Sequence, residues 1–475
     1  MKSVNFAYHR EKLANKMKPG SIALVPSAQV IARNSDTDYP FHQEGNFFYL
    51  TGFEEPNAMA VIQKDLNGNV TYTLFNQKKE PDAEIWTGKR AGQEGALKNF
   101  GADKAFAIDS LDQEMPKLLL GATQIYAPWD ASLTTKINQW KTKASRPNPD
   151  HLSLPEKNIN LSSVMNELRL IKDDAEIERL QKAAEISAKA HVYLMQNCTP
   201  GLFEYQLQGI LDGYCRAKGC NTLAYPSIVA SGENACTLHY VNNNRCINHG
   251  DLVLVDAAGA YDYYTADITR TFPANGKFSL EQKEIYAIVL KAQKAGIAAV
   301  KPGVTFDVLN QLITNTLVEG LIQLGLLTGT VEENIKANKH KDFYPHGFGH
   351  WLGLDVHDVG EYWKAGKSRV LAPNMAFTIE PGIYIQPDNQ NVPEKYRGIG
   401  VRIEDDILVT EEDAEIMSAA VPKEINEIER LMRKAQNKPK PVVYRQQQQQ
   451  QPPLCQILKS SGKTNHYNLR SKQQI

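Results

Sequence analysis

Short apolar runs and helical patterns alternate along the first 160 residues. Residues 21–25 and 70–75 are rich in β-branched and aromatic side chains, which is typical of strands. Residues 91–100 have the pattern of a helix. This alternation predicts an α/β domain over residues 1–160. Residues 145–155 contain three prolines and predict a linker near its end.

A different pattern begins near residue 163. Apolar side chains recur at near-helical spacing over residues 163–196 and predict a long amphipathic helix, with the acidic pair Asp173 and Asp174 as a candidate break. Further helices are predicted over residues 205–218 and 280–300. Short strands lie around and after them, so residues 161–436 are predicted to form an α+β domain.

The last 39 residues, 437–475, differ from both regions. They carry seven Lys or Arg and no acidic residue, and they include six consecutive glutamines followed by two prolines. Removing them leaves 46 basic and 54 acidic residues, a net charge of −8, in 1–436. So few apolar residues cannot build a core, and we expect a disordered, basic tail. A basic arm that contacts an anionic surface is the alternative.

Composition narrows the class of protein. The 475 residues carry 53 basic and 54 acidic side chains, so a nucleic-acid partner is not expected. No apolar run approaches the length of a membrane-spanning helix, and the first 20 residues lack the apolar core of a secretory signal. The six cysteines form no paired metal-binding spacing. We therefore expect a cytoplasmic protein with reduced thiols.

Carboxylates and histidines in four separate contexts carry the candidate chemistry. In the first, Asp256 ends an apolar strand and Asp267 follows eleven residues later. The β-rich runs on either side of Gly259 predict a hairpin-type turn there. A carboxylate at the end of a buried strand needs a positive partner, although a carboxylate that caps the turn would explain Asp256 alone.

The second context is a glycine-rich segment that contains His346, His350 and His357. Its glycines make a regular helix unfavourable, and clustered histidines indicate metal binding or acid–base chemistry rather than a polar loop. In the third context Glu380 ends an apolar strand and is followed by a Pro-Gly turn signal. In the fourth, Arg402 and Glu404 share one face of a strand, either as site residues or as an exposed charge pair.

Together these contexts suggest a site for two divalent cations. The plausible ligands are four carboxylates and one imidazole, namely Asp256, Asp267, His350, Glu380 and Glu404. Such a set suits a hard or borderline metal such as Mn²⁺ better than a thiolate-binding one. Four carboxylates in one pocket would repel each other strongly without cations. Spacing alone leaves open whether the five residues converge.

The motifs also carry a family resemblance. The chain resembles the Xaa-Pro aminopeptidases (aminopeptidase P), proline-specific metallopeptidases of the methionine aminopeptidase and prolidase group with the pita-bread fold. The matching stretches are residues 33–40, 46–56, 83–90, 231–240, 255–259, 265–271, 346–357, 378–382 and 400–405. The similarity extends over residues 1–436 and does not include the tail.

The resemblance implies an architecture and a site. It implies an N-terminal α/β domain of the creatinase/aminopeptidase P type, which helps to assemble a dimer or tetramer and to shape the pocket, followed by a pita-bread catalytic domain. Asp267 and Glu404 would bridge two ions, typically Mn²⁺; Asp256 would hold one ion, and His350 with Glu380 the other. The substrate site would be lined by His239, His346, His357 and Arg402.

The resemblance also implies an activity. Peptides with proline in the second position would lose their N-terminal residue to a hydroxide that bridges the ions. Glu380 would transfer the proton, and His239 and His357 would hydrogen-bond the oxyanion or the proline side. An Xaa-Pro dipeptidase (prolidase) would use the same ligands, but the N-terminal motifs around Trp86 favour the aminopeptidase. A non-catalytic pita-bread binding module would have lost ligands, and all five are present.

Overall fold

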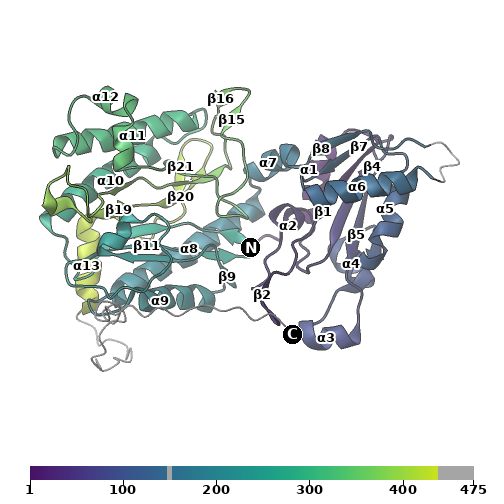
Figure 1. Cartoon of the computed structure of the whole chain (residues 1–475), viewed down its shortest axis with the longest axis horizontal. Helices are drawn as coiled ribbons and strands as arrows, with labels where there is room; N and C mark the ends of the chain where they lie inside the picture. Colours follow the sequence, from purple (N-terminus) through teal and green to yellow (C-terminus); the bar gives the residue numbers. More distant parts are fainter. Residues whose placement is uncertain (147–151, 437–475) are drawn as a thin grey trace, which may run out of the picture. The chain divides into compact units, whose positions relative to one another are not determined.

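The computed structural model describes residues 1–146 and 152–436, and residues Met1–Ala435 form one compact unit (Figure 1). The predicted tail and the middle of the predicted linker lie outside the described residues. Within the described part, no helix combines the length and apolar character needed to cross a membrane.

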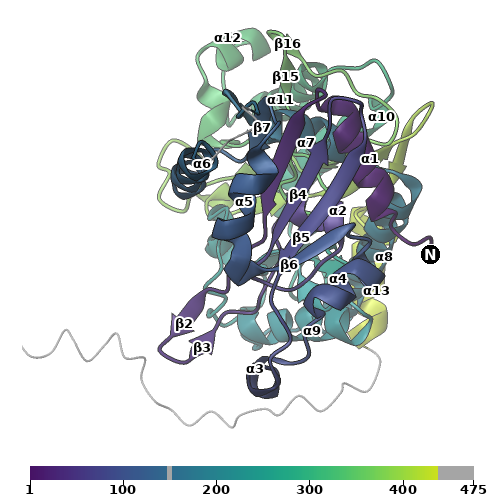
Figure 2. The same ribbon diagram turned by 90° about the vertical axis from the view of Figure 1, so that its right-hand side faces the viewer.

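A six-stranded mixed sheet forms the centre of the N-terminal domain, in the order β6-β5-β4-β1-β7-β8 (Figure 2). Its strands are β1 Ser21–Pro26, β4 Met59–Lys64, β5 Val70–Asn76, β6 Lys104–Ala107, β7 Gln124–Ala127 and β8 Lys157–Asn160. β4 pairs antiparallel with β1 and β5, whereas the other neighbours are parallel. The strands predicted at residues 21–25 and 70–75 are therefore confirmed.

Helices cover both faces of this sheet because side chains alternate along each strand. Ile22 and Leu24 of β1 pack with α5 (Leu111–Leu119) and α6 (Ala131–Ala144). Ala23 and Val25 face the other side. There they pack with residues of α1 Phe6–Lys16, α2 Gly45–Thr51 and α4 Gly92–Phe100. Because both faces of the sheet are buried, the sequences of its strands are continuous apolar runs.

A hairpin and a short helix of the N-terminal domain bury none of their side chains. They are the hairpin β2 Ala32–Asn34 with β3 Thr37–Asp38, and the helix α3 Pro81–Thr87. Their apolar residues are therefore available to a partner surface.

The predicted long helix is divided at the acidic pair. α7 spans Ser162–Leu170 and α8 spans Asp174–Asn197. Asp173 accepts hydrogen bonds from the first turn of α8, and Glu176 closes a capping box with it. The other helices of this part are α9 Glu204–Ala217, α10 Leu280–Ala298, α11 Phe306–Gln323, α12 Val331–Lys336 and α13 Ile425–Gln436, with 3₁₀ turns at Gly232–Cys236, Lys339–Asp342 and Glu394–Tyr396. The N-terminal domain has one such turn, Ile108–Ser110.

Two interrupted antiparallel hairpins form the middle of the C-terminal domain. In the first, β11 Leu252–Asp256 pairs with β14 Thr269–Pro273, and beyond a break β12 Gly259–Tyr261 pairs with β13 Tyr264–Thr265. In the second, β17 Ala376–Ile379 pairs with β20 Asp405–Val409, and beyond a break β18 Gly382–Tyr384 pairs with β19 Gly400–Arg402. Shorter strands complete the sheets, namely β9 Thr222–Leu223, β10 Ile228–Ser231, β15 Trp363–Lys364, β16 Lys367–Ser368 and β21 Ala414–Ile416.

Both predicted turns within these hairpins are wrong. Gly259 begins β12, and the chain reverses at Asp262 and Tyr263, whose φ angles are 46° and 71°. A side chain at Gly259 would meet Cys220 Sγ at 2.5 Å, so close packing accounts for this glycine. The Pro-Gly pair after Glu380 does not reverse the chain either; it marks the break between β17 and β18.

Candidate active site

The hairpin breaks bring the four candidate carboxylates together. Asp256 ends β11, and Asp267 lies between β13 and β14. Glu380 and Glu404 lie in the two arms of the second break. Thr269 and Glu404 form an isolated bridge between the two hairpins. Each break frees a few residues from strand pairing, so the carboxylates turn toward one shared space.

His350 joins three of these carboxylates. Its Nε2 lies 3.3 Å from Asp267 Oδ2 and 3.5 Å from Glu380 Oε1. Asp267, His350 and Glu404 each offer a ligand atom within 4.8 Å of the others. His350 Nδ1 contacts the Trp351 carbonyl at 3.0 Å, which leaves Nε2 directed to the cluster. A backbone acceptor on the far nitrogen is the usual arrangement of a metal-binding histidine.

A hydrogen-bonded chain connects Asp256 to His346. Arg402 Nη2 donates to Asp256 Oδ2 at 2.7 Å, and Arg402 Nη1 donates to the Tyr384 hydroxyl at 3.0 Å. That hydroxyl lies 2.8 Å from His346 Nε2. The alternative of an exposed charge pair on this strand is wrong, since Arg402 and Glu404 are 3% and 1% exposed.

Burial and crowding shift the pKa values of the cluster upward. Burial, with the charge of neighbouring carboxylates, raises the pKa of Asp267 and raises that of Glu404 well above its ordinary value. Burial raises the pKa of Glu380 to about 7. The pKa of His350 rises to about 9, because Asp267 and Glu380 outweigh the effect of burial. Without a cation the site therefore retains protons at neutral pH.

Unsatisfied oxygens test whether cations fit the site. Asp256 Oδ1 and Glu404 Oε1 are buried and have no hydrogen-bond partner in the described part of the chain. Buried carboxylate oxygens are costly without a positive partner. Four carboxylates, one correctly oriented imidazole and two such oxygens fit hard divalent cations.

Three histidines lie around this cluster. His239 and His357 are exposed, whereas His346 is partly buried. The rings of His350 and His357 meet edge to face with centroids 4.1 Å apart. Burial and the Arg402 charge lower the pKa of His346 to about 4, so this ring is neutral at physiological pH. The buried ligands thus lie beneath histidines that solvent and a peptide can reach.

Several buried side chains that support the cluster were not predicted. The Tyr225 hydroxyl donates to Asp267 Oδ1 at 2.6 Å, and the Thr269 hydroxyl donates to Glu404 Oε2 at 2.6 Å. Asp406 accepts from the Asp267 amide at 3.0 Å. A single Tyr or Thr in a strand carries no recognisable signal, whereas the run Glu404-Asp405-Asp406 was a visible clue.

Two other features of the molecule resemble binding sites. His9, Asp173 and Glu176 have the spacing of a metal site, but His9 already contacts the Tyr49 carbonyl at 2.7 Å and Asp173 Oδ2 at 2.8 Å. These contacts indicate a structural role.

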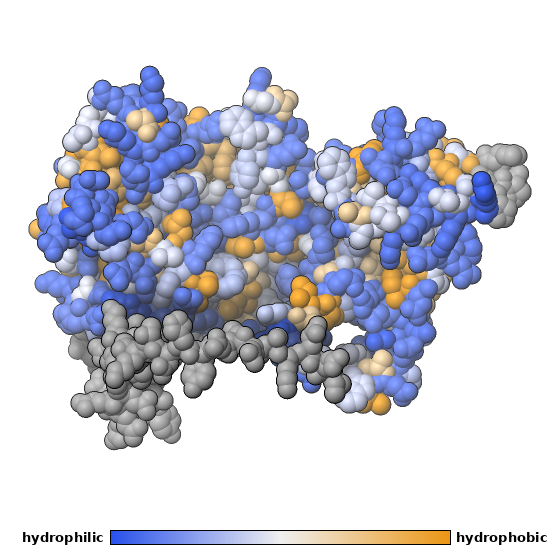
Figure 3. Space-filling model, viewed as in Figure 1, coloured by the Kyte–Doolittle hydropathy of each residue, from blue (hydrophilic) through white to orange (hydrophobic). Residues whose placement is uncertain are grey.

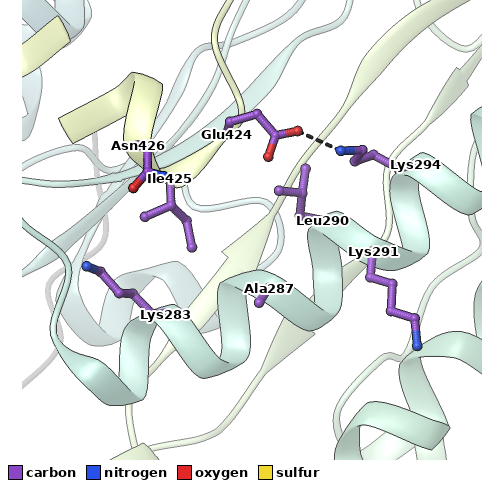
Figure 4. Close-up of a pocket in the computed structure, with 8 residues that line it drawn as sticks. All are labelled: Lys283, Ala287, Leu290, Lys291, Lys294, Glu424, Ile425 and Asn426. Atoms are coloured by element: carbon purple, nitrogen blue, oxygen red, sulfur yellow. Dashed lines mark hydrogen bonds and ion pairs between the residues drawn. The ribbon is translucent and has the colours of Figure 1, made fainter. Parts of the chain in front are cut away.

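The second feature is an open groove of about 590 Å³ between α10 and the start of α13 (Figure 4). Its lining includes three lysines, and Lys294 pairs with Glu424 at 2.8 Å. No candidate site residue lines this groove.

Comparisons with known proteins agree with this geometry. The model of metallopeptidase family M24 matches residues 178–411, and that of the aminopeptidase P N-terminal domain matches residues 6–126. The Xaa-Pro aminopeptidase of Escherichia coli is 42% identical over 429 residues, which are 90% of this chain and 97% of that protein. Human Xaa-Pro aminopeptidase 3 is 34% identical over 451 residues, 92% of this chain and 87% of that protein.

Solved structures give the same result. Aminopeptidase PepP of Pseudomonas aeruginosa has a TM-score of 0.88 and 43% identity over 91% of this chain and 98% of that one. Aminopeptidase P of E. coli with the inhibitor Pro-Leu has a TM-score of 0.88 and 42% identity with the same coverage.

The chain belongs to metallopeptidase family M24, in its Xaa-Pro aminopeptidase group. The predicted fold, an aminopeptidase P N-terminal domain followed by a pita-bread domain, is confirmed. The predicted enzyme class, a metal-dependent aminopeptidase that uses divalent ions, is confirmed as well. These relatives favour the aminopeptidase over both alternatives, the prolidase and the binding module.

Proposed function

We propose that Asp256, Asp267, His350, Glu380 and Glu404 hold two divalent ions, with Asp267 and Glu404 shared between them. Mn²⁺ is the proposed ion, because oxygen donors with one imidazole suit it. The protein then releases the N-terminal residue from peptides with proline in the second position. The observation that carries this proposal is the grouping of Asp267, His350, Glu380 and Glu404, with Asp256 close enough to raise the pKa of two of them. One oxygen each of Asp256 and Glu404 has no hydrogen-bond partner among the described residues.

Each residue has a proposed part in the reaction. The bound ions would activate a water molecule and polarise the scissile carbonyl. Glu380 would accept a proton from the water and return it to the proline nitrogen, which must gain a proton to leave. His239 and His357 donate hydrogen bonds to the oxyanion or to the proline side of the bond. Arg402 and Tyr384 keep His346 oriented beside them.

The N-terminal domain, residues 1–160, has a proposed role in assembly and pocket shape. On α3, Ile85 and Trp86 are 79% and 88% exposed, and Figure 3 shows apolar surface at this helix. Such exposure of large apolar side chains is typical of an interaction surface. We therefore propose a homodimer or homotetramer, which light scattering on the purified protein tests.

The proposed location is the cytoplasm. Cys215, Cys220 and Cys236 are buried, and burial raises the pKa of the Cys236 thiol to about 12. Buried thiols that stay protonated and unpaired are typical of proteins in a reducing compartment.

Peptide cleavage by metal-stripped protein reloaded with Mn²⁺ tests the proposed activity. We would compare an Xaa-Pro dipeptide with an Xaa-Pro-Yaa peptide and include Glu404→Ala. The expected result is metal-dependent release of the first residue from the longer peptide, abolished in the variant. Cleavage of the dipeptide alone would indicate a prolidase. No cleavage with metals bound would leave only a binding role.

A further inference from the structure

A buried ionic cluster lies directly behind the loop that carries His357. Asp358 Oδ1 accepts a hydrogen bond from Arg169 Nη2, and Asp358 Oδ2 accepts one from Lys172 Nζ at 3.0 Å. The three side chains are at most 2% exposed. Burial alone would raise the pKa of Asp358, but the two cations lower it, so the carboxylate remains charged.

The backbone of the loop closes tightly around Asp358. The Asp358 amide donates to the Trp351 carbonyl at 2.9 Å, which closes residues 351–358 into a compact loop. A side chain at Gly353 would overlap the Asp358 carboxylate. Gly353 has no positive φ, so close approach, and not backbone conformation, explains this glycine. The loop is therefore built around the carboxylate.

On its other side the cluster is held by two rigid parts of the chain. Arg169 lies at the end of α7, and its Nη1 donates to Asn46 Oδ1 in α2 at 3.0 Å. Lys172 lies between α7 and α8, and its amide donates to the Asn374 carbonyl at 2.9 Å. The Arg169 and Lys172 side chains thus connect the loop to the junction of α7 and α8 and to the N-terminal domain.

His357 has little else to hold it. Its side chain is exposed, and its ring meets only the edge of His350 among the ring contacts of the described residues. An exposed side chain keeps its place through its backbone, and that backbone is anchored one residue away at Asp358.

We propose that Arg169, Lys172 and Asp358 are positioning residues that hold His357 in register with the scissile bond. The inference rests on the role proposed above for His357. Small misplacements of a reacting group cost large factors in rate, so loss of the cluster lowers kcat more than substrate affinity.

A double-mutant cycle on the full-length, Mn²⁺-loaded protein tests the inference. We would measure kcat and KM on an Xaa-Pro-Yaa peptide for Asp358→Asn, His357→Ala and the double variant. Asp358→Asn is expected to lower kcat about tenfold or more, with KM within about threefold. Because it acts through His357, it should lower kcat less than about threefold further in the His357→Ala background.

The matched control is Glu167→Gln on the same helix, α7. Glu167 forms ion pairs with Arg369 at 2.6 Å and with Lys364 at 3.0 Å, away from the loop. This variant should lose thermal stability but keep kcat. If Asp358→Asn does not fold, Lys172→Met, which keeps the Arg169–Asp358 pair, gives the same cycle with a smaller loss of kcat.

Two outcomes would overturn the inference, and they differ. If the losses in kcat multiply fully in the double variant, Asp358 does not act through His357, although His357 keeps its own role. If His357→Ala leaves kcat unchanged, the proposed role of His357 fails, and the positioning inference fails with it.

Discussion

Single side chains decide which carboxylate oxygens stay available to cations. Arg402 occupies one oxygen of Asp256, and Thr269 occupies one oxygen of Glu404. In both residues the other oxygen is buried and has no hydrogen-bond partner among the residues that the structure describes. Tyr225 binds Asp267 Oδ1 and leaves Oδ2 facing His350. One oxygen orients each carboxylate, and the other remains for a metal.

Thr269→Val tests this division at one residue. The change removes the hydroxyl that donates to Glu404 Oε2 at 2.6 Å and keeps the side-chain volume. In protein treated with EDTA we expect the free energy of unfolding to fall by about 1–3 kcal/mol, because a buried carboxyl group loses its partner. Urea unfolding measures this.

Thr316→Val is the matched control, because the Thr316 hydroxyl donates to the Leu312 carbonyl within its own helix, α11. That variant should lose less than about 1 kcal/mol. Equal losses in the two variants would contradict the special role of Thr269.

Residue types and spacing singled out the side chains that the structure brings together, but not the side chains that support them. Asp256, Asp267, His350, Glu380 and Glu404 stand out because charged residues end apolar strands or lie among glycines. Tyr225, Thr269 and Tyr384 do not, since such residues are common in strands. Their roles arise only from tertiary packing.

At the scale of elements, the breaks in the two hairpins matter more than the turns. The sequence pattern predicted a hairpin-type turn at Gly259 and a turn after Glu380, where the chain in fact continues past a break. A local pattern signals that pairing stops, but it does not say whether the chain turns. The true reversal, at Asp262 and Tyr263, has positive φ at both residues without a glycine, so Asp262 was its only turn signal and a weak one.

The hairpin tip is held by the N-terminal domain, and Tyr263→Ala tests this. The Tyr263 ring stacks on Phe48 at 3.9 Å and lies 4.9 Å from the His42 ring. We expect this variant to lose about 2 kcal/mol of unfolding free energy, because the aromatic contacts disappear while the positive φ remains. Thermal or urea unfolding measures the loss.

Asp262→Gly in the same turn is the comparison. Glycine relieves the φ of 46° and removes the ion pair with Arg179 at 3.4 Å, in which the Asp262 side chain is 54% exposed. Its stability should stay within about 1 kcal/mol of the parent or increase. If both variants lose the same stability, the stacking contacts are not what holds the tip.

At the scale of the whole molecule, contacts between the domains hold the catalytic part in place. His9 of α1 contacts the cap residue of α8, Asp173, at 2.8 Å, and Arg169 reaches Asn46 of α2. The sequence pattern predicted two domains, but contacts between residues more than 100 positions apart leave no local trace. The charge of the metal site is likewise a property of the assembled molecule.

The metal-free protein should be least stable at pH values at which the buried carboxylates of the site must ionise. The pKa of Glu380 is about 7 in the folded protein, against an ordinary value of 4.5. Between these values the folded state binds more protons than the unfolded state, so the stability that Glu380 contributes is complete below pH 4.5 and is lost as the pH rises through 7. A shift of this size corresponds to about 3 kcal/mol.

Comparison with Glu380→Gln isolates this contribution from other groups, such as His346 with its pKa near 4, that titrate in the same range. With EDTA, the free energy of unfolding of the parent minus that of the variant should fall by about 3 kcal/mol between pH 4.5 and pH 8. Urea titrations across this range measure it.

With saturating Mn²⁺ the parent should instead gain stability toward pH 8, because deprotonated carboxylates bind cations more tightly. If the difference in unfolding free energy between parent and variant does not change with pH in EDTA, Glu380 is already ionised in the metal-free protein.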